Sequence, residues 1–196
     1  MTCCLQQPGL AEAERLYGYP LVRDYDLGNW GDRDRFWEMW GKRRGEVVLV
    51  LQRPDGRLIL QTKAFYPPGA FRLPTGSIKD GEHLLAAVRR ETMEETGLPA
   101  RIQRFLGVLC YTFYRRGRRL ERASYVFLLE AGQSEIRPQD ESEQITAYRE
   151  VWATDLGAVA DSLSALASEW APWGQFRALV HRFVAEVLAP QHRVRA

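Results

Sequence analysis

A short run of consecutive apolar residues constrains the fold of this chain more than any other feature of its sequence. Residues 47–51 are five apolar residues in a row, three of them valine, and a second run follows at residues 58–60. Both runs favour strands, because they are too short for a typical buried helix and valine is enriched in sheets. Pro54, Asp55 and Gly56 lie between them and favour a turn. We therefore predict two β-strands joined by this turn.

Two later stretches, residues 102–114 and 120–130, alternate apolar and polar residues. They flank residues 115–119, which hold four arginines and one glycine, so they predict a hairpin with a basic tip. A further strand is expected at residues 148–152. The sequence thus predicts at least five strands.

Three helices are expected at residues 82–97, 155–170 and 173–188. Gly97 and Pro99 suit the end of the first helix. In the last helix, apolar residues recur at helical spacing, which predicts one buried face or a homodimer contact. Strands and helices in this order indicate an α/β fold.

Length and composition indicate one domain with terminal additions. The chain has 196 residues, of which 45% are hydrophobic. Its 27 Lys and Arg nearly balance its 25 Asp and Glu, which argues against a positive potential over the whole surface that would bind nucleic acid. We predict an N-terminal extension over residues 1–45 and a domain with a C-terminal helical segment over residues 46–196. The sequence has three cysteines without zinc-ligand spacing, and we find neither a signal peptide nor a membrane-spanning run in it. We therefore predict a cytoplasmic protein without membrane contact.

The expected helix at residues 82–97 concentrates glutamates. At about 100° per residue, Glu94 and Glu95 lie roughly 60° and 40° to either side of Glu91, so three carboxylates share one sector of the helix. Like charges this close repel each other, and a divalent cation would remove the repulsion. Ligands that are all oxygen favour Mg²⁺, with Mn²⁺ as an alternative. A solvated acidic face is the plainer explanation of any single pair of helical glutamates.

The segment from Gly76 to Leu98 has a more specific pattern than an acidic face requires. It has a glycine, five residues, Glu, seven residues, Arg-Glu, two residues, Glu-Glu, one residue, then glycine and an apolar residue. This pattern resembles the Nudix box. The matching residues are Gly76, Glu82, Arg90, Glu91, Glu94, Glu95, Gly97 and Leu98. Thr92 departs from it, because the family prefers a bulkier apolar residue there; we expect altered packing and unchanged chemistry.

The resemblance implies a Nudix-type α/β/α sandwich with a mixed β-sheet, in which the box forms a loop, helix and loop that hold metal ions. It implies that Glu94, Glu95 and the carbonyl of Gly76 bind metal. Glu91 is a candidate for both metal ligand and general base. Glu82 would support the cluster and Arg90 would orient it.

Residues outside the box are weaker candidates for substrate binding. Arg72 could bind substrate. The tip residues Arg115, Arg116, Arg118 and Arg119, with Arg122 following, could bind phosphates or a nucleic-acid backbone, although charged hairpin tips are more often only solvated. Glu141 or Glu143 could complete the metal site, or belong to a solvated acidic loop. Some aromatic residues could stack on a base, although alternating aromatics in strands are usually core residues; these are Phe65, Tyr66, Tyr111, Phe113 and Tyr114. His83 is expected on the surface of a helix. His181 is expected either on a helix surface or at an interface.

The resemblance implies hydrolysis of a phosphoanhydride bond in a nucleoside diphosphate derivative, such as ADP-ribose or a nucleotide sugar. Hydrolysis of nucleoside triphosphates is one alternative. Removal of pyrophosphate from an RNA 5′ end is another, which the arginine tip alone favours. A noncatalytic nucleotide sensor or interaction module is a third possibility, which the complete set of box acids disfavours.

Overall fold

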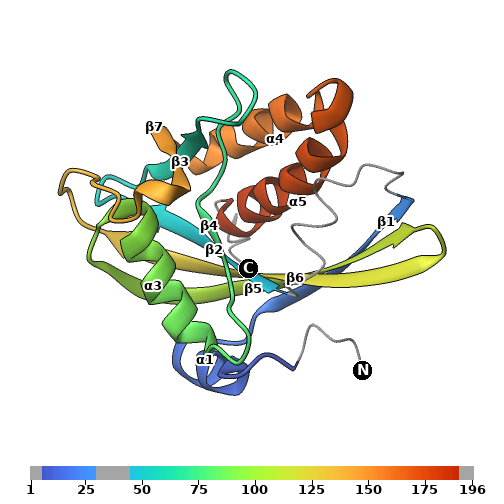
Figure 1. Ribbon diagram of the computed structural model, residues 1–196. Helices are drawn as coiled ribbons and strands as arrows, with labels where there is room; N and C mark the ends of the chain where they lie inside the picture. The colour runs from blue at the N-terminus through green and yellow to red at the C-terminus, as the bar shows by residue number, and fades with distance from the viewer. Residues whose placement is uncertain (1–5, 30–44, 190–196) are drawn as a thin grey trace, which may run out of the picture.

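A computed structural model describes residues 6–29 and 45–189 of the chain. Its centre is a seven-stranded mixed sheet with the strand order β1-β5-β6-β2-β3-β7, in which β4 also pairs with β2 (Figure 1). The strands are β1 (Leu21–Asn29), β2 (Gly45–Gln52), β3 (Leu58–Lys63), β4 (Thr75–Ser77), β5 (Ala100–Arg115), β6 (Arg118–Ala131) and β7 (Ile145–Val151). β2 and β3 contain the two apolar runs, and every residue of β2 except Gln52 is buried.

The predicted hairpin is formed by the two longest strands, β5 and β6. They pair antiparallel from Ala100 and Ala131 up to Arg115 and Arg118. Arg116 and Gly117 form the turn with φ of 45° and 72°. Two positive φ values are typical of the type I′ turn, whose twist matches that of the two strands.

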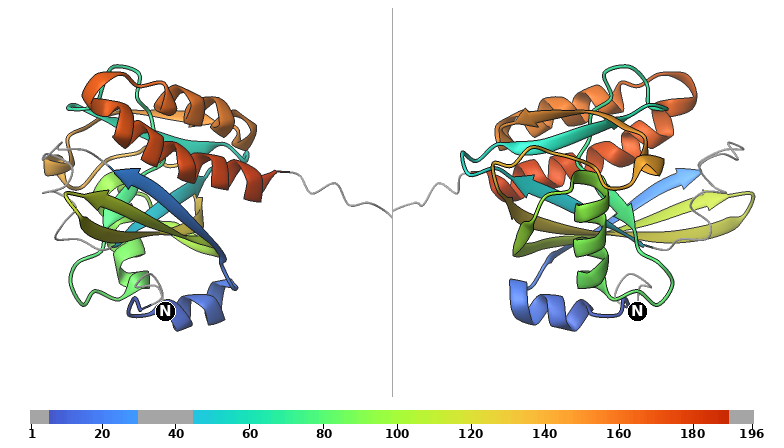
Figure 2. Two further views of the ribbon diagram at one scale, coloured as in Figure 1. Left: turned by 90° about the vertical axis from the view of Figure 1, so that its right-hand side faces the viewer. Right: turned by 60° about the vertical axis from the view of Figure 1, so that its left-hand side comes forward.

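Helices cover both faces of the sheet (Figures 1 and 2). α1 (Leu10–Tyr17) and α3 (Leu84–Thr96) pack over one apolar cluster, which contains Val47, Leu49 and Phe127. α4 (Leu156–Ser164) and α5 (Ala171–Leu188) pack over a second cluster, which contains Val48, Val50 and Phe176. Successive residues of β2 therefore face opposite layers, as the side-chain period of a strand requires. The expected α/β/α sandwich is confirmed.

The N-terminal segment adds a strand that the sequence did not predict. β1 pairs in parallel with β5 from Leu21, which lies opposite Gly107, and forms one edge of the sheet. α1 precedes it and buries Leu10 and Ala13. β1 escaped prediction because its residues are half-buried or exposed, with little contrast between its two faces. Residues 30–44 of the expected extension lie outside the described part.

The short strand β4 was not predicted either. The remaining strands and helices agree with the expected ones to within a few residues, except that the helix expected at residues 155–170 ends at Ser164 and is followed by a short 3₁₀ turn, Ser168–Trp170. None of the helices in the described part of the chain combines the length and hydropathy needed to span a bilayer. Cys110 is buried, while Cys3 and Cys4 lie outside the described residues.

Candidate active site

α3 is held against the sheet by one side, which leaves its acidic side toward a cleft. Leu85 and Val88 are buried under the helix. Thr92 is also buried, and its Oγ1 donates to the carbonyl of Val88 at 2.7 Å. A small hydroxyl residue therefore fits where the box pattern prefers an apolar one. Gly97 ends the helix in the left-handed conformation, with φ of 64°.

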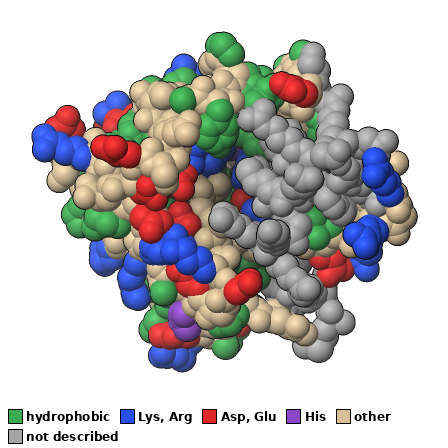
Figure 3. Space-filling model, viewed as in Figure 1, with side chains coloured by type: hydrophobic (Ala, Val, Ile, Leu, Met, Phe, Trp, Pro, Cys, Tyr) green, Lys and Arg blue, Asp and Glu red, His purple; other side chains and the backbone are tan. Residues whose placement is uncertain are grey.

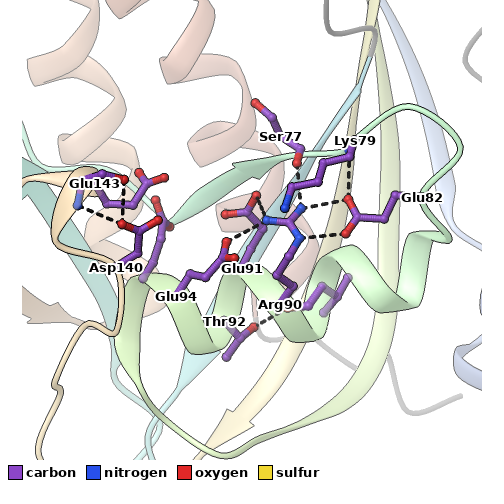
Figure 4. A network of polar contacts seen from close by, with 12 residues as sticks. Ser77, Lys79, Glu82, Arg90, Glu91, Thr92, Glu94, Asp140 and Glu143 are labelled. Carbon is purple, nitrogen blue, oxygen red and sulfur yellow. Dashed lines mark hydrogen bonds and ion pairs between the residues drawn. The ribbon is translucent and has the colours of Figure 1, made fainter.

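Arg90 lies at the centre of the acidic side (Figure 4). Its Nε and Nη2 donate to the two oxygens of Glu82 at 2.7 and 2.8 Å. Its Nη1 donates to Glu91 and to Glu94, each at 2.7 Å, and Nη2 also donates to the carbonyl of Ser77 at 3.0 Å. One guanidinium thus orients three box carboxylates, as the resemblance implied for Arg90.

The carboxylates around Arg90 differ in their protonation. The hydrogen bonds from Arg90 lower the pKa of Glu82 below its ordinary value. Burial raises the pKa of Glu91 to about 7, against the opposing effect of Arg90, and the negative charges of Glu95 and Glu94 raise it further. A carboxyl group with a pKa near neutrality can exchange a proton at physiological pH, which is the property expected of a general base.

Glu95 belongs to a second cluster that contains Lys63. The Nζ of Lys63 lies 3.0 Å from Oε1 of Glu95 and also contacts Glu143. Glu95 is fully buried, and burial raises its pKa despite the nearby Lys63. The contact with Lys63 is an ion pair without hydrogen-bond geometry, because neither oxygen of Glu95 has a hydrogen-bond partner among the described residues. Burying a carboxylate without hydrogen bonds costs free energy, so a ligand that bound to Glu95 would stabilise this arrangement.

These residues fit a hard divalent cation in their chemistry, because the donors are carboxylate oxygens. Yet within residues 6–29 and 45–189, no three His, Cys, Asp or Glu side chains converge as a ready metal-binding group. The reason is that the positive groups of Arg90 and Lys63 already lie among the glutamates. Binding of a cation therefore requires at least one of these contacts to open.

Gly76 lies directly against the acidic cluster. A Cβ atom at this position would lie 1.8 Å from Cδ of Glu91 and 2.0 Å from its Oε2. Only a residue without a side chain lets β4 approach α3 this closely, which explains the glycine of the box. The proximity is consistent with the expected role of its carbonyl, which no contact in the structure tests.

The acidic side of α3 faces a cleft of about 460 Å³. Figure 3 shows acidic side chains gathered beside this hollow, with atoms of Lys or Arg visible inside it. Glu91, Glu94 and Arg90 line one side, together with Gly76, whereas Glu95 lies behind the lining. A cleft of this size suits a nucleotide-sized ligand.

The weaker candidates from the sequence divide into two groups. Arg72 and Glu143 line the cleft. Arg116 and Glu141 are exposed and do not line it, and the side chain of Arg115 lies outside what the structure describes. Asp140, which the sequence analysis did not single out, lines the cleft instead of Glu141 and lies near Glu143 (Figure 4).

The aromatic candidates divide in the same way. Phe65 and Tyr66 line the cleft, whereas Tyr111 and Phe113 are core residues and Tyr114 lies on the surface of β5. Other lining residues were not candidates from the sequence: Glu46, Lys63, Trp170, Trp173 and Arg177. Arg122, which follows the hairpin tip and was a phosphate-binding candidate, does line the cleft. Glu46 begins the apolar run of β2 and Arg177 lies among the apolar positions of α5, so their buried setting was the available signal.

The expectation for His181 was wrong. His181 is fully buried, its Nε2 accepts a hydrogen bond from the backbone N–H of Leu73 at 3.0 Å, and its Nδ1 lies 2.7 Å from the carbonyl of Arg177. Burial lowers its pKa to about 4, so it is neutral and links α5 to the segment before β4. His83 is partly exposed and pairs with Glu12, as expected for a helix surface.

Known proteins resemble parts of this chain. An ADP-ribose pyrophosphatase from Methanocaldococcus jannaschii is 32% identical over 95 residues, which are 48% of this chain and 55% of that protein. An RNA pyrophosphohydrolase from Caulobacter vibrioides is 41% identical over 58 residues, 29% of this chain and 34% of that protein. The match thus spans about half and a third of these relatives. The solved structure of the E. coli dihydroneopterin triphosphate pyrophosphohydrolase has a TM-score of 0.47 and 20% identity, covering 74% of this chain and 97% of that one.

The NUDIX domain matches residues 42–186. This region covers well over half of the chain, and it includes β2, the box segment and α5 almost to its end. The chain therefore belongs to the Nudix family.

Proposed function

We propose that the chain is a pyrophosphohydrolase that cleaves a phosphoanhydride bond in a nucleoside diphosphate derivative, with Mg²⁺ as its cofactor and Mn²⁺ as an alternative. The observation that carries this proposal is the convergence of Glu91, Glu94 and Arg90 on one nucleotide-sized cleft. Membership of the Nudix family supports the same reaction, since both relatives named above are pyrophosphate-cleaving enzymes by name.

The cation would be held by Glu94, Glu95 and the carbonyl of Gly76, with Glu91 as a further ligand. A divalent cation, when bound, neutralises phosphate charge and lowers the pKa of a coordinated water. Glu143 and Asp140 also line the cleft and are the candidates for a ligand outside the box.

The protein's own groups have separate roles in this proposal. Arg90 keeps Glu91 and Glu94 oriented by its two hydrogen bonds from Nη1. Glu91, whose pKa of about 7 leaves a large ionised fraction at neutral pH, accepts the proton of the attacking water. Tyr66, Trp170 and Trp173 form an aromatic part of the lining that suits a base or sugar face.

Among possible substrates we place ADP-ribose and nucleotide sugars first. The ADP-ribose pyrophosphatase from M. jannaschii is the relative that matches over the longer stretch. Cleavage of an RNA 5′ end is the second candidate, favoured by the C. vibrioides relative. The hairpin tip does not add to it, since Arg116 does not line the cleft. The homodimer and the cytoplasmic location expected from the sequence stay predictions.

A panel of nucleotides with identification of the products tests this proposal. The panel would contain ADP-ribose, nucleotide sugars, nucleoside triphosphates and a 5′-triphosphorylated RNA, each with Mg²⁺ and with EDTA. We expect metal-dependent release of a nucleoside monophosphate from ADP-ribose or a nucleotide sugar. Activity on the RNA alone would reverse the order of candidates, and inactivity on all compounds would favour a nucleotide-binding module.

A further inference from the structure

Three buried arginines line the cleft in addition to the box residues. Arg72 precedes β4, Arg122 lies on β6 and Arg177 lies on α5, so three distant parts of the chain contribute one side chain each. They are 3%, 3% and 6% exposed. Arginine is rarely buried this deeply without a partner that balances its charge. We call these three residues the arginine wall.

Among the described residues, the arginine wall has few acidic side chains at ion-pair distance. Glu46 pairs with Arg122 at 3.2 Å and with Arg177 at 2.7 Å. This single carboxylate also accepts from Ser124 at 2.7 Å, and the two guanidinium groups lower its pKa to about 2 despite its burial, so it is fully ionised. Arg72 makes no ion pair with any residue that the structure describes. Among the described residues, Glu46 is thus the carboxylate that pairs with Arg122 and Arg177, and Arg72 has no carboxylate within ion-pair distance.

The wall also has hydrogen-bond donors without acceptors. Nε of Arg177 is buried and has no partner among the described residues. Among the described residues, the side chain of Arg177 makes one hydrogen bond, from Nη1 to Glu46, so its Nη2 has no acceptor there either. In Arg72, Nε donates to Tyr66, and Nη1 donates to the carbonyl of Leu73 and to Thr75. Its Nη2 likewise has no acceptor among the described residues.

A purely structural role does not account for this arrangement. A buried charge without an ion-pair partner costs free energy, and Arg72 is in this situation among the described residues. His181 nevertheless ties the backbone beside Arg72 to that of Arg177. Its ring accepts from the backbone N–H of Leu73 and hydrogen-bonds to the carbonyl of Arg177. The result is a fixed set of N–H donors that line the cleft, which is the arrangement that binds an anion with several oxygens.

We propose that the arginine wall binds a second phosphate group of the substrate, separate from the diphosphate that is cleaved at α3. This proposal rests on the proposed function for the site, and it narrows the substrate class. The preferred substrate is a nucleotide derivative that has a further phosphate, for example on a ribose.

The decisive comparison uses pairs of compounds that differ by one ribose phosphate. NADP⁺ with NAD⁺, and coenzyme A with dephospho-coenzyme A, are two such pairs. The wild-type protein should show a kcat/KM that is roughly 10-fold to 100-fold higher for the phosphorylated member of at least one pair, as expected for charged hydrogen bonds. Equal rates within every pair would overturn the proposal.

Arg177→Met removes the guanidinium group of Arg177 but leaves Glu46 its contacts with Arg122 and Ser124. It should abolish the preference for the phosphorylated compound, so that the ratio of the two kcat/KM values falls to about 1, because only the phosphorylated compound engages the guanidinium. Arg182→Met is the matched control, since Arg182 lies on the same helix, is exposed and pairs with Asp161. An equal loss for both compounds in Arg177→Met would show a merely structural role. Arg177→Lys should keep the fold with an intermediate preference, so a failure of the Met variant to fold still leaves a test.

A binding experiment separates this proposal from the proposed hydrolysis. Metal-free protein in EDTA is titrated with pyrophosphate by calorimetry. We expect one site in wild type and in Arg182→Met, and no site in Arg177→Met. If wild type binds pyrophosphate in this way but hydrolyses none of the nucleotides, the arginine wall stands and the proposed hydrolysis fails. Absence of binding in wild type overturns the arginine wall, whatever the activity.

Discussion

Glu91, Glu94 and Glu95 lie on one turn of α3, yet each has a different environment. Glu91 is buried beside Arg90, Glu94 is partly exposed in the cleft, and Glu95 is enclosed beside Lys63. The side chains of Arg90 and Lys63 thus lie among the negative charges of glutamates that are neighbours in the sequence. The family resemblance assigns a shared role to these glutamates, and the structure gives each one its own partners.

At the residue scale, Glu95→Gln should abolish turnover and preserve the fold. The substitution keeps the volume of the side chain and removes a buried negative charge whose pKa is already raised by burial. We expect kcat/KM to fall at least roughly 100-fold, which corresponds to about 2.7 kcal/mol of transition-state stabilisation. The rise in unfolding temperature on addition of Mg²⁺ should shrink as well. Glu135→Gln, at an exposed surface pair with Arg137, is the control, and normal activity of Glu95→Gln would remove the metal assignment.

Glu91 gives a pH-dependent prediction. Its pKa is raised from 4.5 to about 7 in the folded protein, so the folded state binds a proton more tightly than the unfolded state does. Its contribution to stability is therefore greatest below pH 4.5 and is lost as the pH rises through 7. Metal-free Glu91→Gln should become more stable than wild type across this window, by up to about 3 kcal/mol.

Urea unfolding of both proteins in EDTA at several pH values measures this difference. Taking the difference removes the contributions of His181 and Glu46, which titrate alike in the two proteins. A difference in free energy of unfolding that stays constant from pH 4.5 to 8 would show that burial does not control the protonation of Glu91.

At the element scale, β4 and α3 depend on a close approach at Gly76. Gly76→Ala should preserve the strand, because Gly76 has no positive φ, but it should displace the Glu91 carboxyl group that lies in the way of the new Cβ. We expect turnover to fall at least roughly 10-fold, about 1.4 kcal/mol, with an unchanged circular dichroism spectrum. Gly132→Ala is the control, since nothing lies within 4 Å of its added Cβ. Full activity of the Gly76 variant would contradict the close approach.

At the scale of the whole molecule, the N-terminal segment is part of the folded sandwich. β1 completes the sheet beside β5, Tyr25 stacks on Tyr111 with centroids 5.7 Å apart, and Leu10 of α1 is buried. Removal of residues 1–29 should lower the free energy of unfolding by at least roughly 2 kcal/mol, the amount expected from one buried leucine. An unchanged urea midpoint would show that this segment is an independent appendage.

The homodimer is also a question for the whole molecule. The apolar face of α5 suggested such a contact, but Trp173, Phe176 and Phe183 on that face are buried within the chain's own second core cluster. A dimer would therefore have to use another surface. Light scattering after size exclusion measures the mass directly, and a mass of 22.5 kDa at all concentrations would refute the dimer.

The sequence by itself determined the local structure and the family. The apolar runs, the alternating hairpin and the box helix are all patterns among neighbouring residues, and local steric and hydrophobic preferences suffice to read them. The Arg90 interaction with Glu94 is of the same kind, because helical geometry brings together the side chains of residues four apart.

The tertiary structure decided which distant residues share the cleft. Lys63, Arg122 and Arg177 come from β3, β6 and α5, and no pattern along the chain joins them. It also decided that Asp140 lines the cleft while Glu141 and Arg116 do not. The physical reason is that sheet order and helix packing, which depend on contacts between distant segments, determine which side chains meet.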